Sequence, residues 1–103
     1  VIVDPSGKFA YVANHDSGNV SAYSIGSNGA LTPVTGSPFA TGINPYSVTV
    51  DPSGSFVYVA NYGDGIAASN VSAYLIESSG ALTLIGSFTA GTGPVSITAI
   101  GII

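Results

Sequence analysis

Cysteine, methionine, tryptophan and arginine are absent from the 103-residue sequence, and only 6% of its residues are charged. Without cysteine the chain has neither disulfides nor thiolate metal ligands, and its redox compartment cannot be inferred. Lys8 is the one basic residue, and the formal net charge is −4. Nucleic-acid binding depends on basic side chains that neutralise phosphates, and attraction to anionic membranes depends on the same charges. The charge balance therefore argues against both partners.

Long apolar runs are also lacking, although 46% of the residues are hydrophobic. No stretch approaches the roughly 18 uninterrupted apolar residues that a membrane-spanning helix needs. No signal-peptide pattern is visible, and the opening Val1-Ile2-Val3 indicates a processed product or a piece of a longer chain. A surface rich in Ser, Thr, Asn and Gly and poor in charge favours an extracellular or cell-surface location.

An internal repeat dominates what the chain does contain. DPSGKFAYVAN at residues 4–14 returns as DPSGSFVYVAN at residues 51–61, an offset of 47 with nine of eleven positions identical. Asp, Pro and Gly at the first, second and fourth positions match a type I β-turn, and the aromatic and β-branched residues that follow predict a strand. NVSAY at residues 19–23 recurs at residues 70–74, an offset of 51. The increase from 47 to 51 places four extra residues in the loop between Asn61 and Asn70.

A repeat of this length with four short strands predicts an all-β fold made of β-propeller blades. Both faces of each predicted strand are apolar, which disfavours a β-sandwich with one wet face, and β-solenoid coils are usually shorter. Each blade should be a four-stranded antiparallel meander, with the Asp-Pro-Ser-Gly turns at one end and the loops of His15 and Asp64 at the other. The predicted units are residues 1–44 (blade 1, with a truncated inner strand), 45–93 (blade 2) and 94–103 (the inner strand of a following blade).

The repeated segments resemble the YVTN-type repeats of the lactonase-like β-propeller family. The resemblance covers nearly the whole chain and implies a propeller of about seven blades, two of which have complete patterns here. It also implies a group that includes lactonases, lactone-forming enzymes and many surface proteins. The enzymes of the family place His, Arg and Glu around a central pore. The segments that carry the resemblance are residues 4–14, 19–25 and 29–42 in one copy and 51–61, 70–76 and 80–91 in the other.

The family's catalytic set is incomplete in this chain. There is no Arg, His15 is the only His, and Glu77 is the only Glu. Glu77 should lie at the end opposite His15, so we do not predict that the two act together. His15 is the single candidate general base, and a solvated loop pair with Asp16 is the other interpretation. We therefore assign no catalytic residue and no cofactor.

Five residues fall in the loops that should surround the pore, where a carbohydrate or small molecule could bind. Asp16 and Asp64 are also candidate calcium ligands, although no known calcium-loop spacing is present. The five predicted ligand-binding loop residues are His15, Asp16, Tyr46, Tyr62 and Asp64.

The sequons at Asn19 and Asn70 recur with the blade, which favours a role at the start of a strand over a glycan site. Four other tyrosines lie within strand patterns, where packing between blades is the favoured role. They are Tyr11, Tyr23, Tyr58 and Tyr74.

Two functions remain open. The first is a structural or binding module that is non-catalytic as an isolated chain. It would assemble with copies of itself, head to tail, into a ring of three or four chains or a filament, through a strand at residues 95–100 and the uncovered blade faces. The alternative is a fragment of a lactonase-type propeller enzyme that acts on a lactone or sugar lactone.

Overall fold

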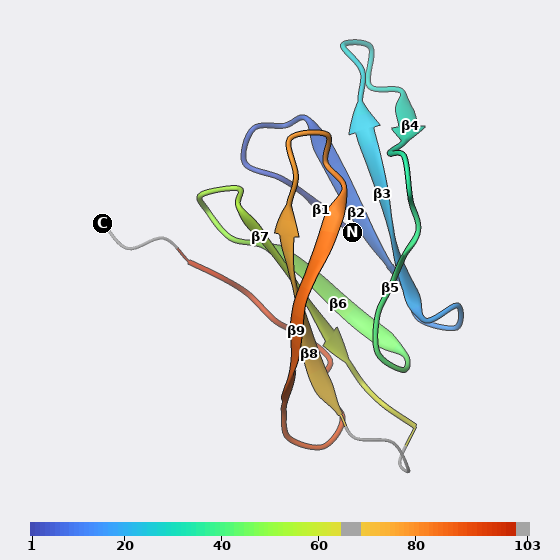
Figure 1. Ribbon diagram of the computed structural model, residues 1–103, viewed down its shortest axis with the longest axis vertical. Helices are drawn as coiled ribbons and strands as arrows, with labels where there is room; N and C mark the ends of the chain where they lie inside the picture. The colour runs from blue at the N-terminus through green and yellow to red at the C-terminus, as the bar shows by residue number, and fades with distance from the viewer. Residues whose placement is uncertain (65–68, 101–103) are drawn as a thin grey trace.

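The computed structural model describes residues 1–64 and 69–100, and its regular structure is entirely β. Two antiparallel sheets each follow a meander, as the repeat predicts (Figure 1). No helix occurs in the described ranges, so none there is long and apolar enough to cross a membrane. The strands in these ranges are β1 (Ile2–Val3), β2 (Phe9–Asn14), β3 (Asn19–Ile25), β4 (Leu31–Pro33), β5 (Phe39–Ala40), β6 (Pro45–Val50), β7 (Phe56–Asn61), β8 (Asn70–Ile76) and β9 (Leu82–Thr89).

The second sheet is a complete blade. Its strands are paired in the order β6-β7-β8-β9, with β6 at one edge and β9 at the other. Val57 pairs with Tyr74 and Tyr58 with Ala73, so the two tyrosines lie on opposite faces. This is the order of the four-stranded meander that the repeat predicts.

The first sheet differs at both edges. Its outer strand is divided into β4 and β5, which pair in turn with β3. Pro33 and Pro38 lack the N–H that a ladder needs, and Gly36 has a φ of 92°, so the strand cannot run straight through this segment. At the inner edge, β1 pairs only with Tyr11 and Ala10.

The chain after β9 forms no strand in its described part. Residues 94–100 leave the second sheet on the side away from the first (Figure 1). The predicted inner strand needs a neighbouring strand for its hydrogen bonds, and no strand among the described residues pairs with this segment. Residues 101–103 of that predicted strand, and residues 65–68 of the predicted loop insertion, lie outside the described residues.

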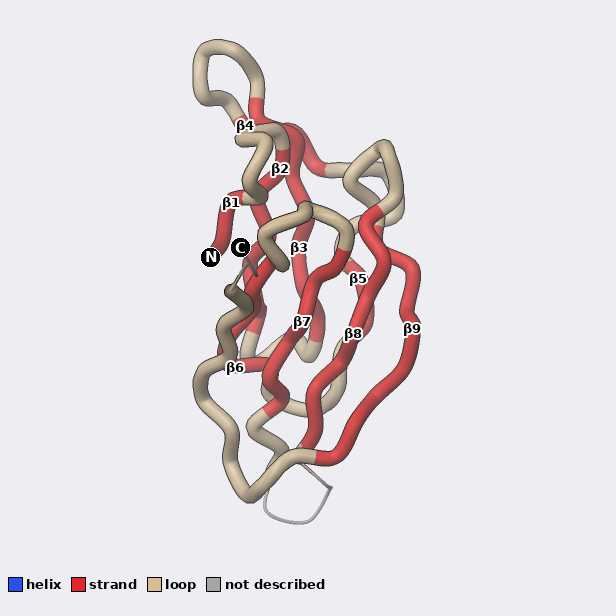
Figure 2. Tube along the Cα trace, turned by 90° about the vertical axis from the view of Figure 1, so that its left-hand side faces the viewer, coloured by secondary structure: helices blue, strands red, loops and turns tan. Residues whose placement is uncertain are grey.

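The core lies between the two sheets, which pack side by side (Figure 2). It is formed by one face of each sheet, and Tyr11 and Val57 are fully buried there, with Tyr74 only 2% exposed. Tyr23 and Tyr58 lie on the outward faces and are half-buried. Tyr11 and Tyr74 therefore pack between the two blades, as predicted, whereas Tyr23 and Tyr58 face away from that interface.

Candidate functional site

The two ends of the sheets carry different loops. Residues 41–44 join the first sheet to the second and lie beside both long loops, because the Thr41 N–H donates to the Gly18 carbonyl and the Tyr62 N–H to the Asn44 carbonyl. We call this the loop end. The opposite end, with the Asp-Pro-Ser-Gly turns, is the turn end. This separation is the one that the meander predicts.

At the loop end, three of the five predicted loop residues come together. The rings of His15 and Tyr46 meet edge to face with centroids 5.6 Å apart, and the rings of Tyr46 and Tyr62 are 5.7 Å apart. A pocket of about 310 Å³ opens beside them, lined by Ala13, His15, Pro45 and Tyr46. Its walls come from both sheets, since Ala13 is the last residue but one of β2 and Pro45 begins β6.

The imidazole of His15 is held by its neighbour in sequence. His15 Nδ1 and Asp16 Oδ1 are 2.7 Å apart, and the His15 side chain is 46% exposed. When Nδ1 carries the proton that is shared with the carboxylate, Nε2 is left as an acceptor. The pair can thus present a basic nitrogen beside an aromatic wall.

A polar cluster supports each long loop, and sequence reasoning missed it. In the first sheet, the Asn14 amide donates to Asn19 Oδ1 and Ser21 Oγ, both at 2.8 Å. The Asn61 amide makes the equivalent bonds in the second sheet, to Asn70 Oδ1 at 2.7 Å and Ser72 Oγ at 2.9 Å. Each cluster links the last residue of one strand to the start of the next, at the base of the loop that carries His15 or Tyr62. The sequence did contain a sign of these clusters, because an asparagine recurs at the end of β2 and of β7.

These contacts explain why the sequons recur. Asn19 and Asn70 begin β3 and β8, and each accepts a hydrogen bond from the asparagine of the preceding strand. Gly42 packs on the second cluster, where a Cβ would lie 2.8 Å from Asn61 Nδ2 and from Asn70 Oδ1. Both sequon asparagines thus have a structural role at the start of a strand.

The remaining predicted loop residue, Asp64, is exposed and follows Gly63, whose N–H donates to the Ile43 carbonyl. Within residues 1–64 and 69–100, no group of three His, Cys, Asp or Glu side chains is placed to hold a metal ion. The described structure therefore does not bring Asp16 and Asp64 into a three-ligand cluster.

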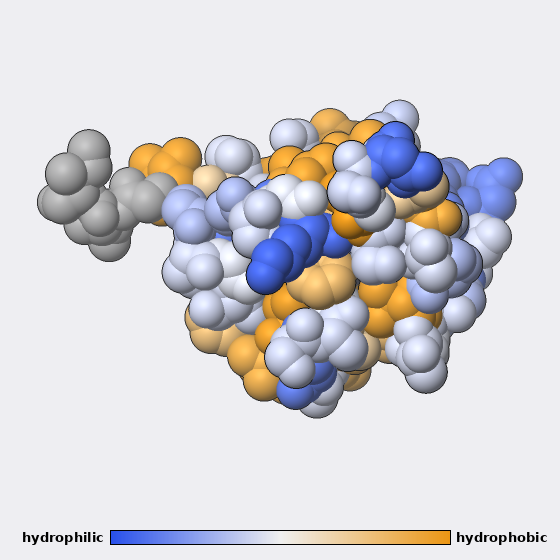
Figure 3. Space-filling view, turned by 90° about the horizontal axis from the view of Figure 1, so that it is seen from above, coloured by the Kyte–Doolittle hydropathy of each residue, from blue (hydrophilic) through white to orange (hydrophobic). Residues whose placement is uncertain are grey.

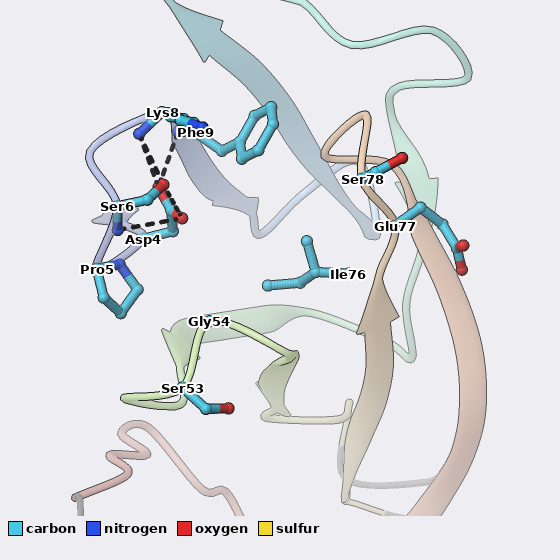
Figure 4. A pocket seen from close by; sticks show the side chains of 10 residues that line it. All are labelled: Asp4, Pro5, Ser6, Lys8, Phe9, Ser53, Gly54, Ile76, Glu77 and Ser78. Atoms are coloured by element: carbon cyan, nitrogen blue, oxygen red, sulfur yellow. Dashed lines mark hydrogen bonds between the residues drawn. The ribbon is translucent and has the colours of Figure 1, made fainter.

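The turn end carries four of the six charged side chains, among them the one lysine and the one glutamate. Figure 3 views this end, where hydrophilic residues alternate with apolar surface. A second pocket, of about 290 Å³, lies between the turns, and Asp4, Lys8 and Glu77 are among its lining residues (Figure 4). Glu77 accepts a hydrogen bond from Thr83. It is thus at the end opposite His15, as expected.

The aspartate of each turn holds its own backbone. Asp4 Oδ1 accepts the N–H groups of Lys8 and Phe9, both at 2.9 Å, and Asp4 Oδ2 accepts the Ser6 hydroxyl at 2.6 Å. Desolvation by burial raises the pKa of Asp4, but these hydrogen bonds together outweigh it, and the pKa falls below its ordinary value of 3.8. Asp51 repeats the arrangement, and its pKa is lowered for the same reasons. These carboxylates stabilise turns and are not free to act as ligands.

Comparison with solved structures finds propellers of greater length. A candidate 6-phosphogluconolactonase from Bacteroides uniformis superposes with a TM-score of 0.80 at 22% identity, over 90% of this chain and 27% of that one. Another, from Bacteroides fragilis, gives 0.79 at 26% identity, over 91% and 26%. Hydrazine synthase from Kuenenia stuttgartiensis gives 0.73 at 22% identity, over 93% and 24%. The chain thus spans about a quarter of the length of these structures.

The fold alone does not distinguish lactone chemistry from the chemistry of hydrazine synthase, and a search of the curated proteins finds no match. The family-level comparison is more specific. The model of the family described as "Lactonase, 7-bladed beta-propeller" matches residues 1–99. The two blades, their order of strands and this match agree with one another, and the chain belongs to the lactonase family of seven-bladed β-propellers.

Proposed function

We propose that the chain supplies two neighbouring blades of a lactonase-type propeller, and that the pocket beside His15 binds a sugar lactone or the hydroxy acid formed from it. The observation that carries this proposal is the pocket of about 310 Å³ in which His15 and Tyr46 meet from different blades. Its volume is at the lower end of the range of ligand pockets, which suits a single-ring ligand. The names of the two Bacteroides structures support a lactone as the class of substrate.

The chemistry requires a base near the lactone carbonyl. Water attacks the carbonyl carbon, the carbonyl oxygen takes the negative charge, and the ring C–O bond then breaks to give the hydroxy acid. Nε2 of His15 can take the proton of the attacking water, while Asp16 holds the imidazole and stabilises it once it is protonated. Tyr46, 54% exposed, and Tyr62, 43% exposed, offer ring faces and hydroxyls to a sugar.

One part of a complete site is missing from these blades. Hydrolysis needs hydrogen-bond donors or a cation at the developing oxyanion, but the sequence contains no arginine, and Lys8 lies at the turn end. We therefore propose that other blades supply this group and that the isolated chain binds without accelerating hydrolysis. The same lack of cations favours an unphosphorylated sugar lactone over a 6-phosphorylated one.

The test is an NMR titration of the 103-residue chain with D-gluconate, the hydroxy acid of a simple sugar lactone, and with 6-phosphogluconate. Gluconate should shift the His15 imidazole and Tyr46 amide signals in a saturable way, and the phosphorylated acid should bind no more tightly. Tyr46→Ala should weaken binding at least fivefold, whereas Glu77→Gln, at the turn end, should leave it unchanged. An absence of saturable shifts, or shifts confined to the turn end, would contradict the proposal.

A further inference from the structure

The pocket at the turn end takes its walls from both blades. The first Asp-Pro-Ser-Gly turn contributes Lys8, the second contributes Ser53, and the turn between β8 and β9 contributes Glu77. The blades of a propeller stand side by side around an axis, so a further blade would cover the outward face of a sheet and leave the ends of its strands open. The walls of this pocket therefore do not depend on any blade beyond the two described.

The middle of the pocket is apolar and is fixed by the contact between the blades. Phe9 of the first sheet and Ile76 of the second both line it, and Figure 4 shows their side chains projecting into the space between the turns. The Phe9 ring lies over Gly80, on which a Cβ would come within 2.5 Å of the ring. The Tyr11 hydroxyl donates to the Gly80 carbonyl at 2.9 Å. These contacts hold the two turns at a set spacing.

The two free charges of the pocket are places where the repeats differ. By the offset of 47, Lys8 corresponds to Ser55, and by the offset of 51, Glu77 corresponds to Gly26. The turns at Ser55 and Gly26 form with the same backbone hydrogen bonds as those at Lys8 and Glu77. The fold of a blade thus needs neither charge. What the two charges add belongs to this one boundary between blades.

The two charges are not paired with each other. Within residues 1–64 and 69–100, the Lys8 ammonium has no ion-pair or hydrogen-bond partner. Glu77 Oε2 accepts the Thr83 hydroxyl at 3.0 Å, which holds the carboxylate at the rim beside β9. Figure 4 shows Lys8 and Glu77 on opposite sides of the apolar side chains. The pocket thus has a positive side, an apolar middle and a negative rim.

This order of charges selects one class of ligand. A simple anion would be repelled by Glu77 and a simple cation by Lys8, whereas a zwitterion with its charges at opposite ends is attracted by both. A short peptide has this form, because its ammonium and its carboxylate are separated by a body that can carry an apolar side chain. The volume of about 290 Å³ is just below the usual range of ligand pockets, which restricts the peptide to a small one.

We propose that the pocket at the turn end binds a dipeptide with an apolar side chain. The C-terminal carboxylate of the dipeptide contacts Lys8, its N-terminal ammonium contacts Glu77 Oε1, and its side chain packs on Phe9 and Ile76. No covalent bond is made or broken. This binding is independent of the pocket beside His15, which lies at the other end of the sheets.

An NMR titration of the 103-residue chain with leucyl-alanine tests the site. The Ile76 methyl signals and the Lys8 and Ser53 amide signals should shift in a saturable way, and those of His15 and Tyr46 should not. Three matched ligands remove the terminal charges: the N-acetylated dipeptide, the dipeptide amide and the form that is capped at both ends. Each single cap should weaken binding about fivefold, the upper range for a solvent-exposed ion pair, and the doubly capped form should bind most weakly.

Two substitutions assign the ends of the ligand. Lys8→Ser introduces the residue that the second repeat has at this position, and it should remove the preference for the free carboxylate over the amide. Glu77→Gln keeps an acceptor for Thr83 and should remove the preference for the free amine over its acetylated form. Thr35→Val, at an exposed position outside the lining of the pocket, should change neither preference.

Four outcomes would overturn the proposal. Three concern binding: no saturable shift at the turn end, equal binding of the free and doubly capped dipeptides, and end preferences that survive both substitutions. The fourth is that Lys8 and Glu77 act only on each other across the boundary, so that both variants lower the urea midpoint and no dipeptide binds. Because the walls of the pocket belong to these two blades, the same titration in a longer chain that contains them should give the same result, whether or not the 103 residues keep their β-structure alone.

Discussion

The closed interface between the sheets and the two outward faces are built from the same repeated residues, yet only the interface encloses them. Tyr11 is fully buried and hydrogen-bonded, whereas Tyr58, at the same place in the next repeat, is half-buried and its hydroxyl has no hydrogen-bond partner in the described part of the chain. The turns behave differently, because Asp4 and Asp51 make the same hydrogen bonds in both blades. The residues of one repeat thus determine the geometry of its turn, whereas the neighbouring blade determines how deeply the strand side chains are buried.

The largest effect should come from removing the interface tyrosine. Tyr11→Ala should lower the free energy of unfolding by about 3–5 kcal/mol, the usual cost of truncating a buried aromatic residue. Tyr58→Ala should cost only about 1 kcal/mol in the monomer, because its ring is half-exposed. Urea unfolding at the lowest practical concentration measures both. Equal losses would mean that the interface is no better packed than the outward faces.

The two glycines give a second matched pair. Gly80 and Gly29 have φ angles of 88° and 85°, so alanine at either pays about 1–2 kcal/mol for a left-handed backbone. At Gly80 the new Cβ would also meet the Phe9 ring, which should add about 1–3 kcal/mol. The difference between the two variants in the monomer isolates the interface contribution. A Gly29→Ala variant as unstable as Gly80→Ala would show that backbone strain alone decides the cost.

Much of this fold could be predicted because its signals are local and repeated. The Asp-Pro-Ser-Gly turns and the strands that follow them each depend on a few adjacent residues, and the meander then separates the two ends. Which tyrosines are enclosed could not be predicted, since that depends on how many blades stand beside each strand. A strand was also predicted for the segment after β9, but no strand among residues 1–64 and 69–100 pairs with that segment.

The candidate site shows the same limit. His15 and Tyr46 could be assigned to one end of the molecule from the order of strands, but their ring contact depends on the spacing between two sheets. The asparagine clusters were missed because the recurring NVS pattern was considered apart from Asn14 and Asn61, the residues that donate to it.

The turn aspartates should give equal and intermediate effects. Asp4→Ala and Asp51→Ala should each cost about 1–3 kcal/mol at pH 7, because each removes a carboxylate that accepts several hydrogen bonds. Since both pKa values are lowered in the folded state, this stability is fully present above the ordinary value of 3.8 and is lost as the pH falls through the folded-state values. The variants should therefore approach the parent chain in urea midpoint at low pH. A clear difference between Asp4→Ala and Asp51→Ala would show that the neighbouring blade does affect the turn.

The smallest effect concerns a single hydroxyl. Tyr11→Phe should cost about 1 kcal/mol at neutral pH, because the Gly80 carbonyl loses its donor, whereas Tyr58→Phe should cost less than about 0.5 kcal/mol in the monomer. Desolvation, with a further contribution from the charge of Asp4, raises the pKa of Tyr11 from 10.0 to about 12. A raised folded-state pKa contributes stability that is complete below pH 10 and is lost as the pH rises towards 12. Urea midpoints between pH 8 and pH 11.5 should therefore fall less steeply for Tyr11→Phe than for the parent chain. Some of the fall should remain, because burial raises the pKa of Tyr74 as well, partly offset by its hydrogen bond with Ser72. If Tyr11→Phe and the parent fell in parallel, the interface tyrosine would titrate as an exposed one does, and the distinction between the closed and open faces would not extend to its hydroxyl.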